Sequence, residues 1–79
     1  MDRDEILTIV REILVSVLKH ERFEMRDELV ARDVDGWDSL SHMAIIVAIE
    51  ERFGFKFKLK ELNKLTNMGA LVALIQSKT

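Results

Sequence analysis

The sequence predicts an all-α fold: a small four-helix bundle of three main helices and one short helix, with a long loop between the first and second helices. The 79 residues include no proline and only three glycines, so few positions interrupt a helix. Apolar residues recur at helical spacing in three separate segments. A chain of this length has room for one domain, so we expect residues 1–79 to form a single domain.

The first helix is expected between Asp4 and Leu18. At about 100° per residue its apolar residues fall on one stripe, which is typical of an amphipathic helix packed on a core. This stripe comprises Ile6, Leu7, Val10, Ile13, Leu14, Val17 and Leu18. The next segment, from Lys19 to Trp37, mixes charged with scattered apolar residues and has no clear period, so we expect a long ordered loop.

The second helix is expected from Asp38 to about Phe53. Asp38 is a good N-cap residue, and Gly54 suits the C-terminal stop because glycine readily adopts the left-handed conformation that ends many helices. Residues 55–60 alternate strictly between apolar residues and lysine. A lone strand would have no partner, so we expect this segment to be an extended connector.

A short third helix is expected from Leu59 to Lys64, followed by a last helix that Thr66 or Asn67 can cap. One face of the last helix carries Met68, Leu71, Val72 and Ile75, which predicts packing on the core. Gly69 lies within this helix, where glycine costs about 1 kcal/mol relative to alanine. We expect it to allow close packing.

The second helix differs from the first because it has apolar residues on two opposite sides. The residues that suit the core are Ile45, Ile46, Ile49 and Phe53. About half a turn away lies a second stripe of Leu40, Met43 and Val47, flanked by Ala44, Glu50 and Glu51. Either this stripe is an exposed docking surface for a partner with an apolar groove and a basic rim, or the fourth helix or the long loop covers it.

The composition argues against several classes of function. The chain has no cysteine, which rules out disulfides and thiolate metal sites, and its two histidines, His20 and His42, form no metal-ligand pattern. A net charge of -2 argues against a nucleic-acid binder. The acidic N-terminus does not resemble a signal peptide, and charges interrupt every apolar run before it could span a membrane. We therefore expect a cytoplasmic protein without a metal site of its own.

Ser39 lies at the start of the second helix, within the sequence Asp38-Ser39-Leu40. Unpaired backbone N–H groups and the helix dipole favour a negatively charged group at such a position, so a phosphodiester on Ser39 would be well placed. The same tripeptide is also typical of ordinary helix capping. By itself it does not distinguish the two interpretations.

Residues 33–57, DVDGWDSLSHMAIIVAIEERFGFKF, resemble the phosphopantetheine-attachment region of acyl carrier proteins, and the flanking helices match that family along nearly the full chain. The resemblance implies that Ser39 receives a 4'-phosphopantetheine arm from coenzyme A through a separate Mg²⁺-dependent phosphopantetheinyl transferase. It implies that Asp38 helps to organise the metal-bound transfer complex and that Leu40 completes the motif. Acyl intermediates would then be carried as thioesters on the arm, which brings the thiol that the sequence lacks.

The resemblance also assigns partner docking to Leu40, Met43, Val47, Glu50 and Glu51. Many family members have an acidic residue where this chain has Ala44, and they are often acidic where this chain has the basic patch of Lys56, Lys58, Lys60 and Lys64. These departures indicate a specialised stand-alone carrier, expected to be a monomer, in fatty-acid, polyketide or related biosynthesis. Its expected partners are the phosphopantetheinyl transferase and acyl-loading and acyl-processing enzymes.

Two alternatives stay open at this point. A peptidyl or aryl carrier for an amino-acid-activating enzyme would share the fold and the modified serine. An unmodified helical interaction module would use only the stripe of Leu40, Met43 and Val47. We do not expect an enzyme, because one serine without a base or an oxyanion partner makes a poor active site.

Three further expectations concern packing near the site. Trp37, the only tryptophan, is expected to anchor the start of the second helix. His42 is expected to lie at the edge of the core or the surface, with an acyl pocket as the alternative. If the cargo is sequestered, the cavity is expected among Ile45, Ile49, Phe53, Leu62 and Ile75.

Overall fold

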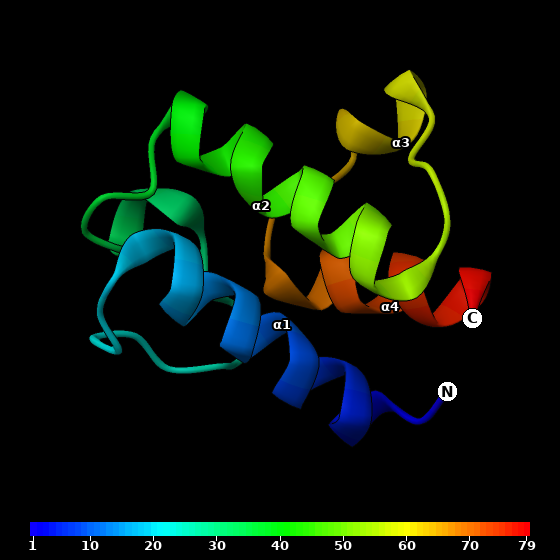
Figure 1. The fold of residues 1–79 in the computed structure, drawn as a ribbon, viewed down its shortest axis with the longest axis horizontal. Helices are drawn as coiled ribbons and strands as arrows, with labels where there is room; N and C mark the ends of the chain where they lie inside the picture. The colour runs from blue at the N-terminus through cyan, green and yellow to red at the C-terminus, as the bar shows by residue number, and fades with distance from the viewer.

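The computed structural model describes residues 1–79 and contains four α-helices and one short 3₁₀ helix (Figure 1). They are α1 (Arg3–Leu18), η1 (Ala31–Asp33), α2 (Ser39–Phe53), α3 (Leu59–Leu62) and α4 (Met68–Lys78). The predicted all-α fold of three main helices and one short helix is confirmed. Three details differ: α1 begins at Arg3 rather than at Asp4, η1 interrupts the long loop, and α3 ends at Leu62 rather than at Lys64.

Side-chain and backbone caps determine where the main helices begin and end. The Asp2 carboxylate accepts the N–H of Asp4 at 2.7 Å at the start of α1. Asn67, rather than Thr66, caps α4, because its side-chain oxygen accepts the N–H of Ala70 at 2.8 Å. Gly54 ends α2 with a φ of 77°, as its position predicts.

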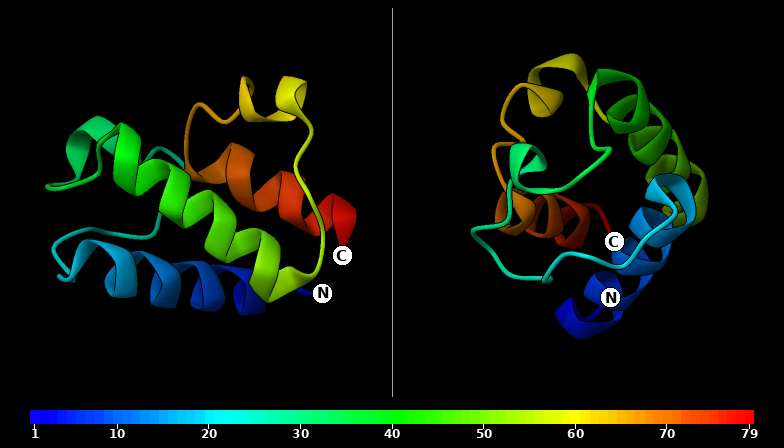
Figure 2. Two further views of the ribbon diagram at one scale, coloured as in Figure 1. Left: turned by 45° about the horizontal axis from the view of Figure 1, so that its top comes forward. Right: turned by 90° about the vertical axis from the view of Figure 1, so that its left-hand side faces the viewer.

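The core lies between α1, α2 and α4, and α1 packs against both of the others (Figure 2). Each helix contributes one apolar face, and the predicted faces are confirmed. The buried residues of the three helices are Ile6, Val10, Leu14 and Leu18 of α1, Ile45, Ile46 and Ile49 of α2, and Met68, Leu71, Val72 and Ile75 of α4. Phe53 is only partly buried and packs at the edge of this cluster.

The long loop is attached to the start of α4 by its own backbone. The N–H of Met68 donates to the carbonyl oxygen of Leu29 at 2.8 Å, and the N–H of Gly69 donates to that of Asp27 at 3.0 Å. These bonds satisfy two of the N–H groups that the first turn of a helix leaves unpaired. Asp27 also pairs with Arg3 at the start of α1. The middle of the loop is therefore held against two helices.

The attachment of the loop to α4 requires a glycine at position 69. A Cβ placed on Gly69 would lie 3.0 Å from the Cβ and 3.1 Å from the Cγ of Asp27, closer than carbon atoms normally approach. The expectation that Gly69 allows close packing is confirmed, although its neighbour is the loop and not another helix. Because Gly69 has no side chain, the backbone at the start of α4 can approach the backbone of the loop at Asp27.

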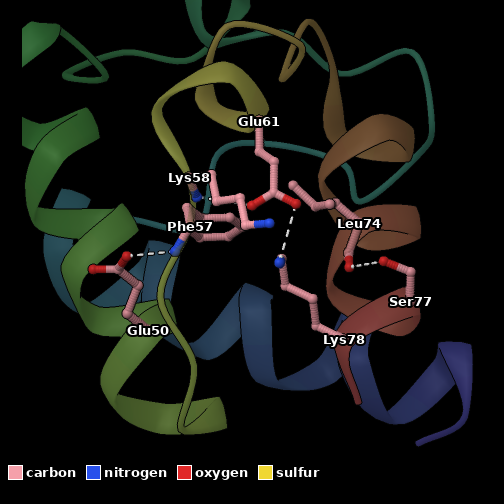
Figure 3. A network of polar contacts seen from close by, with 7 residues as sticks. All are labelled: Glu50, Phe57, Lys58, Glu61, Leu74, Ser77 and Lys78. Atoms are coloured by element: carbon pink, nitrogen blue, oxygen red, sulfur yellow. Dashed lines mark hydrogen bonds and ion pairs between the residues drawn. The ribbon is translucent and has the colours of Figure 1, made fainter.

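The connector between α2 and α3 is extended, as predicted, and polar contacts hold it from both sides (Figure 3). The Glu50 carboxylate accepts the N–H of Phe57 at 2.8 Å. The Glu61 carboxylate accepts the N–H of Lys58 at 2.7 Å and pairs with the ammonium group of Lys78 at 3.0 Å. The connector is thereby tied to α2, α3 and the end of α4.

Replacing Gly69 by alanine should lower the free energy of unfolding by about 1 kcal/mol. Overpacking against Asp27 costs about 1–3 kcal/mol, and the higher helix propensity of alanine recovers at most about 1 kcal/mol. Chemical denaturation of the wild type and of Gly69→Ala measures the difference.

The matched control is the same substitution in an Asp27→Gly background, which lacks the Cβ and Cγ atoms that cause the clash. There Gly69→Ala should cost clearly less stability, because only the contact with the Cα of residue 27, at 3.3 Å, remains. An equal loss of stability in both backgrounds would contradict the steric explanation.

Candidate modification site at the start of α2

The first turn of α2 is built as a reciprocal capping box. The Asp38 carboxylate accepts the N–H of Ser41 at 2.9 Å, and the Ser41 hydroxyl accepts the N–H of Asp38 at 2.9 Å. The same hydroxyl donates to the carbonyl oxygen of Gly36 at 2.8 Å. Asp38 is the N-cap that the sequence predicts, and the Ser41 hydroxyl is fully used in holding the turn.

Ser39 differs from Ser41 although both lie in the same turn. Ser39 is the first residue of α2, is exposed, and takes no part in the side-chain hydrogen bonds of the turn. Its hydroxyl is therefore free and accessible from solvent. The backbone N–H groups of the first turn lie beside it, where they favour a negatively charged substituent.

Asp38 provides a negative charge next to this hydroxyl. Hydrogen bonds lower the pKa of Asp38 below its ordinary value of 3.8, the largest contribution coming from the N–H of Ser41 and the next from its hydroxyl. The carboxylate is consequently ionised at neutral pH.

Ser39 lies on an open groove of about 570 Å³ between η1 and α2. The groove is lined by Ala31, Arg32, Trp37, Asp38, Ser39, His42 and Met43. Arg32 is the only lysine or arginine in this lining and forms no ion pair within the protein. The sequence reasoning missed Arg32 because the loop has no period that would predict η1. A negative group on Ser39 would find a counter-charge there.

Known proteins resemble this chain in sequence and in structure. Residues 5–75 match the family model described as "Phosphopantetheine attachment site". An acyl carrier protein of an Exiguobacterium species is 30% identical over 78 residues, which is 99% of each chain. One from Rubrobacter xylanophilus is 34% identical over 68 residues, 86% of this chain and 84% of the relative.

The solution structure of a holo acyl carrier protein from Geobacter metallireducens superposes with a TM-score of 0.85 and 40% identity. The superposition covers 92% of this chain and 84% of that chain. The chain belongs to the acyl carrier protein family. The predicted carrier function and the covalent phosphopantetheine cofactor are therefore confirmed, and so is the expectation that it is not an enzyme, because the family consists of carriers.

The second apolar stripe of α2 is exposed on this carrier. Leu40, Met43 and Val47 keep 83%, 52% and 47% of their surface accessible. The alternative that α4 or the long loop covers the stripe is wrong. Ala44 and Glu51 are exposed beside it. The carrier thus has an uncovered apolar strip that begins next to Ser39.

Glu50 does not belong to this strip. It is half-buried, and its carboxylate accepts the N–H of Phe57 in the connector. Leu59 is instead an apolar side chain that is 77% exposed at the start of α3. The sequence reasoning overlooked it because strict alternation places Leu59 with Phe55 and Phe57, whereas the start of α3 turns it outward.

A smaller, half-open pocket of about 80 Å³ adjoins the groove of the carrier. Ala31, Trp37 and His42 line both spaces, and the remaining walls of the pocket are Leu29, Val30, Leu65, Thr66, Asn67, Met68 and Leu71. This pocket is not the cavity expected, if the cargo is sequestered, among Ile45, Ile49, Phe53, Leu62 and Ile75; that expectation stays a prediction. Without cargo, Ile45, Ile49 and Ile75 are fully buried in the core and do not line the pocket.

Trp37 and His42 lie where the sequence places them, at the edge of the core. Trp37 packs against the buried cluster, as expected of an anchor. Its indole Nε1–H donates to the Nδ1 atom of His42 at 3.1 Å. The two rings stack with centroids 6.1 Å apart and planes 25° apart. This pairing was not predicted.

Two other features of the carrier concern metals and membranes. No group of three or more histidine or carboxylate side chains comes together as a metal site. None of the helices has the length and apolar character that a membrane span needs.

Asp38→Ala should lower the melting temperature of the carrier at neutral pH because it removes the cap of α2. The folded-state pKa of Asp38 is lowered, so its stabilising effect is present above the ordinary value of 3.8 and is lost as the pH falls through the folded pKa. The gap in melting temperature between wild type and Asp38→Ala should therefore narrow in acid. Circular dichroism melts across this pH range measure it.

Asp38→Asn is the matched control, because asparagine keeps an acceptor oxygen that does not titrate. Its melting temperature should stay close to that of the wild type at neutral pH. If the gap between wild type and Asp38→Ala is the same in acid as at neutral pH, the carboxylate is not what holds the turn.

Proposed function

We propose that Ser39 is the residue to which the 4'-phosphopantetheine arm is attached and that acyl intermediates are carried as thioesters on the thiol of that arm. The observation that supports this choice most directly is the contrast between the two serines of the first turn. The Ser41 hydroxyl is held by three backbone contacts, whereas the Ser39 hydroxyl is exposed and free. Modification of Ser39 would break no hydrogen bond of the turn, whereas modification of Ser41 would break those that its hydroxyl makes.

The residues around Ser39 suit a phosphodiester. The N–H groups at the start of α2 and the Arg32 side chain supply positive charge on the groove side. In the transfer, the Ser39 oxygen forms a bond to the phosphorus that carries the pantetheine group of coenzyme A. The adenosine bisphosphate leaves, and the serine proton passes to a base of the transferase. Asp38 would ligate the Mg²⁺ ion of that complex.

We propose that the phosphopantetheinyl transferase and the acyl-loading and acyl-processing enzymes dock on the exposed strip of Leu40, Met43 and Val47, with Glu51 at its rim. An apolar strip next to the modified residue fits a partner with an apolar groove. Glu50 is left out of this proposal, because its carboxylate is bound to the connector.

The charges around the strip favour a specialised carrier in fatty-acid, polyketide or related biosynthesis. The uncharged Ala44 lies beside the strip, and the exposed Lys56, Lys58, Lys60 and Lys64 form a basic patch around α3. Partners that depend on acidic residues along α2 would bind this carrier weakly. We further propose a monomeric single domain in the cytoplasm, and the lack of cysteine suits that reducing compartment.

Incubation with coenzyme A, Mg²⁺ and a broad-specificity phosphopantetheinyl transferase should raise the intact mass of the protein by one phosphopantetheine group. Ser39→Ala should show no increase. Ser41→Ala is the matched control. It loses the capping box but keeps the Ser39 hydroxyl, so it should still be modified. A mass increase that survives in Ser39→Ala would refute the assignment.

Loading assays separate the proposed function from its alternatives. If malonyl or fatty acyl donors load the modified protein and aminoacyl donors do not, the acyl carrier is supported over the peptidyl or aryl carrier. If the protein is instead an unmodified interaction module, Ser39→Ala should bind its partner as well as the wild type does, and no transferase should modify the wild type.

Met43→Ser and Val47→Ser should each raise the KM of the transferase for the carrier severalfold, up to about tenfold. Both residues belong to the apolar strip, and truncating a residue at the apolar centre of an interface commonly costs more than about 1 kcal/mol of binding free energy. The value of kcat should change little. Steady-state transfer of a labelled arm measures both constants. Ala73→Ser, at an exposed position on α4, serves as the control and should behave as the wild type does.

A further inference from the structure

The charges of this carrier are divided along its chain. Between Phe53 and Thr79 the only acidic residue is Glu61, and every other aspartate and glutamate precedes Phe53. Glu61 is paired with Lys78 at 3.0 Å. The basic patch of Lys56, Lys58, Lys60 and Lys64 is exposed, and none of these lysines forms an ion pair within the protein. This part of the surface is therefore positively charged, although the net charge of the chain is -2.

The backbone beneath the patch is fixed before any partner arrives. Alternate residues of an extended segment point to the same side, so Lys56 and Lys58 are exposed whereas Phe57 between them is buried. The Glu50 carboxylate accepts the N–H of Phe57, and the Glu61 carboxylate accepts the N–H of Lys58 (Figure 3). A surface that is already ordered loses less conformational entropy on binding than a mobile one does.

An open groove of about 410 Å³ adjoins the patch between α3 and α4. Its apolar lining includes Leu65, Ala70 and Leu74, and it is also lined by Lys60 and Lys64 of the patch. A further apolar side chain, Leu59, lies between two lysines of the patch in the sequence and keeps 77% of its surface accessible. Apolar surface and uncompensated positive charge thus occur together on this side of the carrier.

The charge and the shape of this surface together indicate the kind of partner that it fits. Its lysines attract carboxylates, and binding them breaks no ion pair of the fold. A groove with an apolar lining fits a protruding apolar side chain, which a flat lipid surface does not provide. Helices that lie on membranes have a continuous apolar face, whereas α3 has only 4 residues. These observations favour an acidic polypeptide over a membrane.

We propose that the basic patch and the adjoining groove form a second docking surface, which binds an acidic segment of a partner protein and takes one apolar side chain of that segment into the groove. Leu59 adds apolar contact at the patch. This surface has the opposite charge to the strip of α2, which has Glu51 at its rim. The inference does not depend on attachment at Ser39, so the unmodified protein tests it.

The experiment titrates the ¹⁵N-labelled carrier with short synthetic peptides of glutamate and serine that contain one leucine, placed at a different position in each peptide. At least one peptide should give saturable amide shifts concentrated at residues 56–65 and 70–74. Nuclear Overhauser contacts should join its leucine methyls to Leu65, Ala70 or Leu74. The same peptide with serine in place of leucine should bind severalfold more weakly, and added salt should weaken binding further.

Substitutions in the carrier test the two components of the surface separately. Lys60→Glu and Lys64→Glu should each weaken binding severalfold, because each replaces an attraction by a repulsion. Leu59→Ser should also weaken it severalfold without a change of charge. The matched control is Arg52→Glu, which reverses an exposed cation that does not line the groove and should bind as the wild type does. Lys64 lies in an exposed turn after α3, so its variant keeps the test available if Lys60→Glu does not fold.

Several results would overturn the inference. They are the absence of saturable binding by every peptide up to millimolar concentration, equal binding of the leucine and serine peptides, and an equal loss of affinity in Arg52→Glu and Lys64→Glu. Tighter binding to vesicles of phosphatidylserine and phosphatidylcholine than to any peptide would assign the patch to a lipid surface instead. Self-association of the carrier that Lys64→Glu abolishes would assign it to a second copy. Modification of Ser39 is measured separately by intact mass, so its failure would affect only the proposed function.

Discussion

The close approach between the long loop and the start of α4 is the contact on which the site depends. Because Gly69 has no side chain, Asp27 and Leu29 can accept the first N–H groups of α4. This fixes the loop immediately before η1, a single turn with no side-chain cap, which has little stability of its own. η1 carries Ala31 and Arg32 to the groove at Ser39. The contact between the loop and the start of α4 thus positions Ala31 and Arg32, which form one side of the groove at Ser39.

Within α2, structural and functional roles are divided among adjacent residues. Asp38 and Ser41 cap the start of the helix by hydrogen bonds to each other's backbone N–H groups. Ser39 lies between them, and its hydroxyl has no hydrogen-bond partner within the turn. A modification on Ser39 therefore breaks no hydrogen bond of the fold. On the opposite side, buried Ile45 and Ile49 fix the helix in the core. The turn can accept a charged substituent on Ser39 because the hydrogen bonds that hold the turn do not involve the Ser39 side chain.

Local signals explain which parts of this structure could be predicted from the sequence. The apolar period of α1 and α4 and the caps at Asp38, Gly54 and Asn67 depend on residues within a turn or two of each other. The smaller pocket depends on contacts between distant segments, and the role of Glu50 depends on the path that the chain takes after α2 ends. On a helical wheel Glu50 flanks the exposed stripe, yet its carboxylate bends toward the N–H of Phe57, which only the folded connector places there. Pairing of Trp37 with His42 likewise requires the exact path of the chain into α2.

One helix carries both Ser39, the proposed attachment point, and the proposed docking strip of Leu40, Met43 and Val47. Val47 follows Ser39 by eight residues, so at about 1.5 Å per residue the strip extends roughly 12 Å along the axis from the modified serine. Because the buried face of α2 holds it in place, that distance does not vary when the carrier moves between partners. An enzyme that binds the strip meets the origin of the arm at a constant position, and only the arm itself must search for the catalytic centre. Docking on a rigid helix therefore raises the effective concentration of the cargo at each partner without any new contact to the cargo.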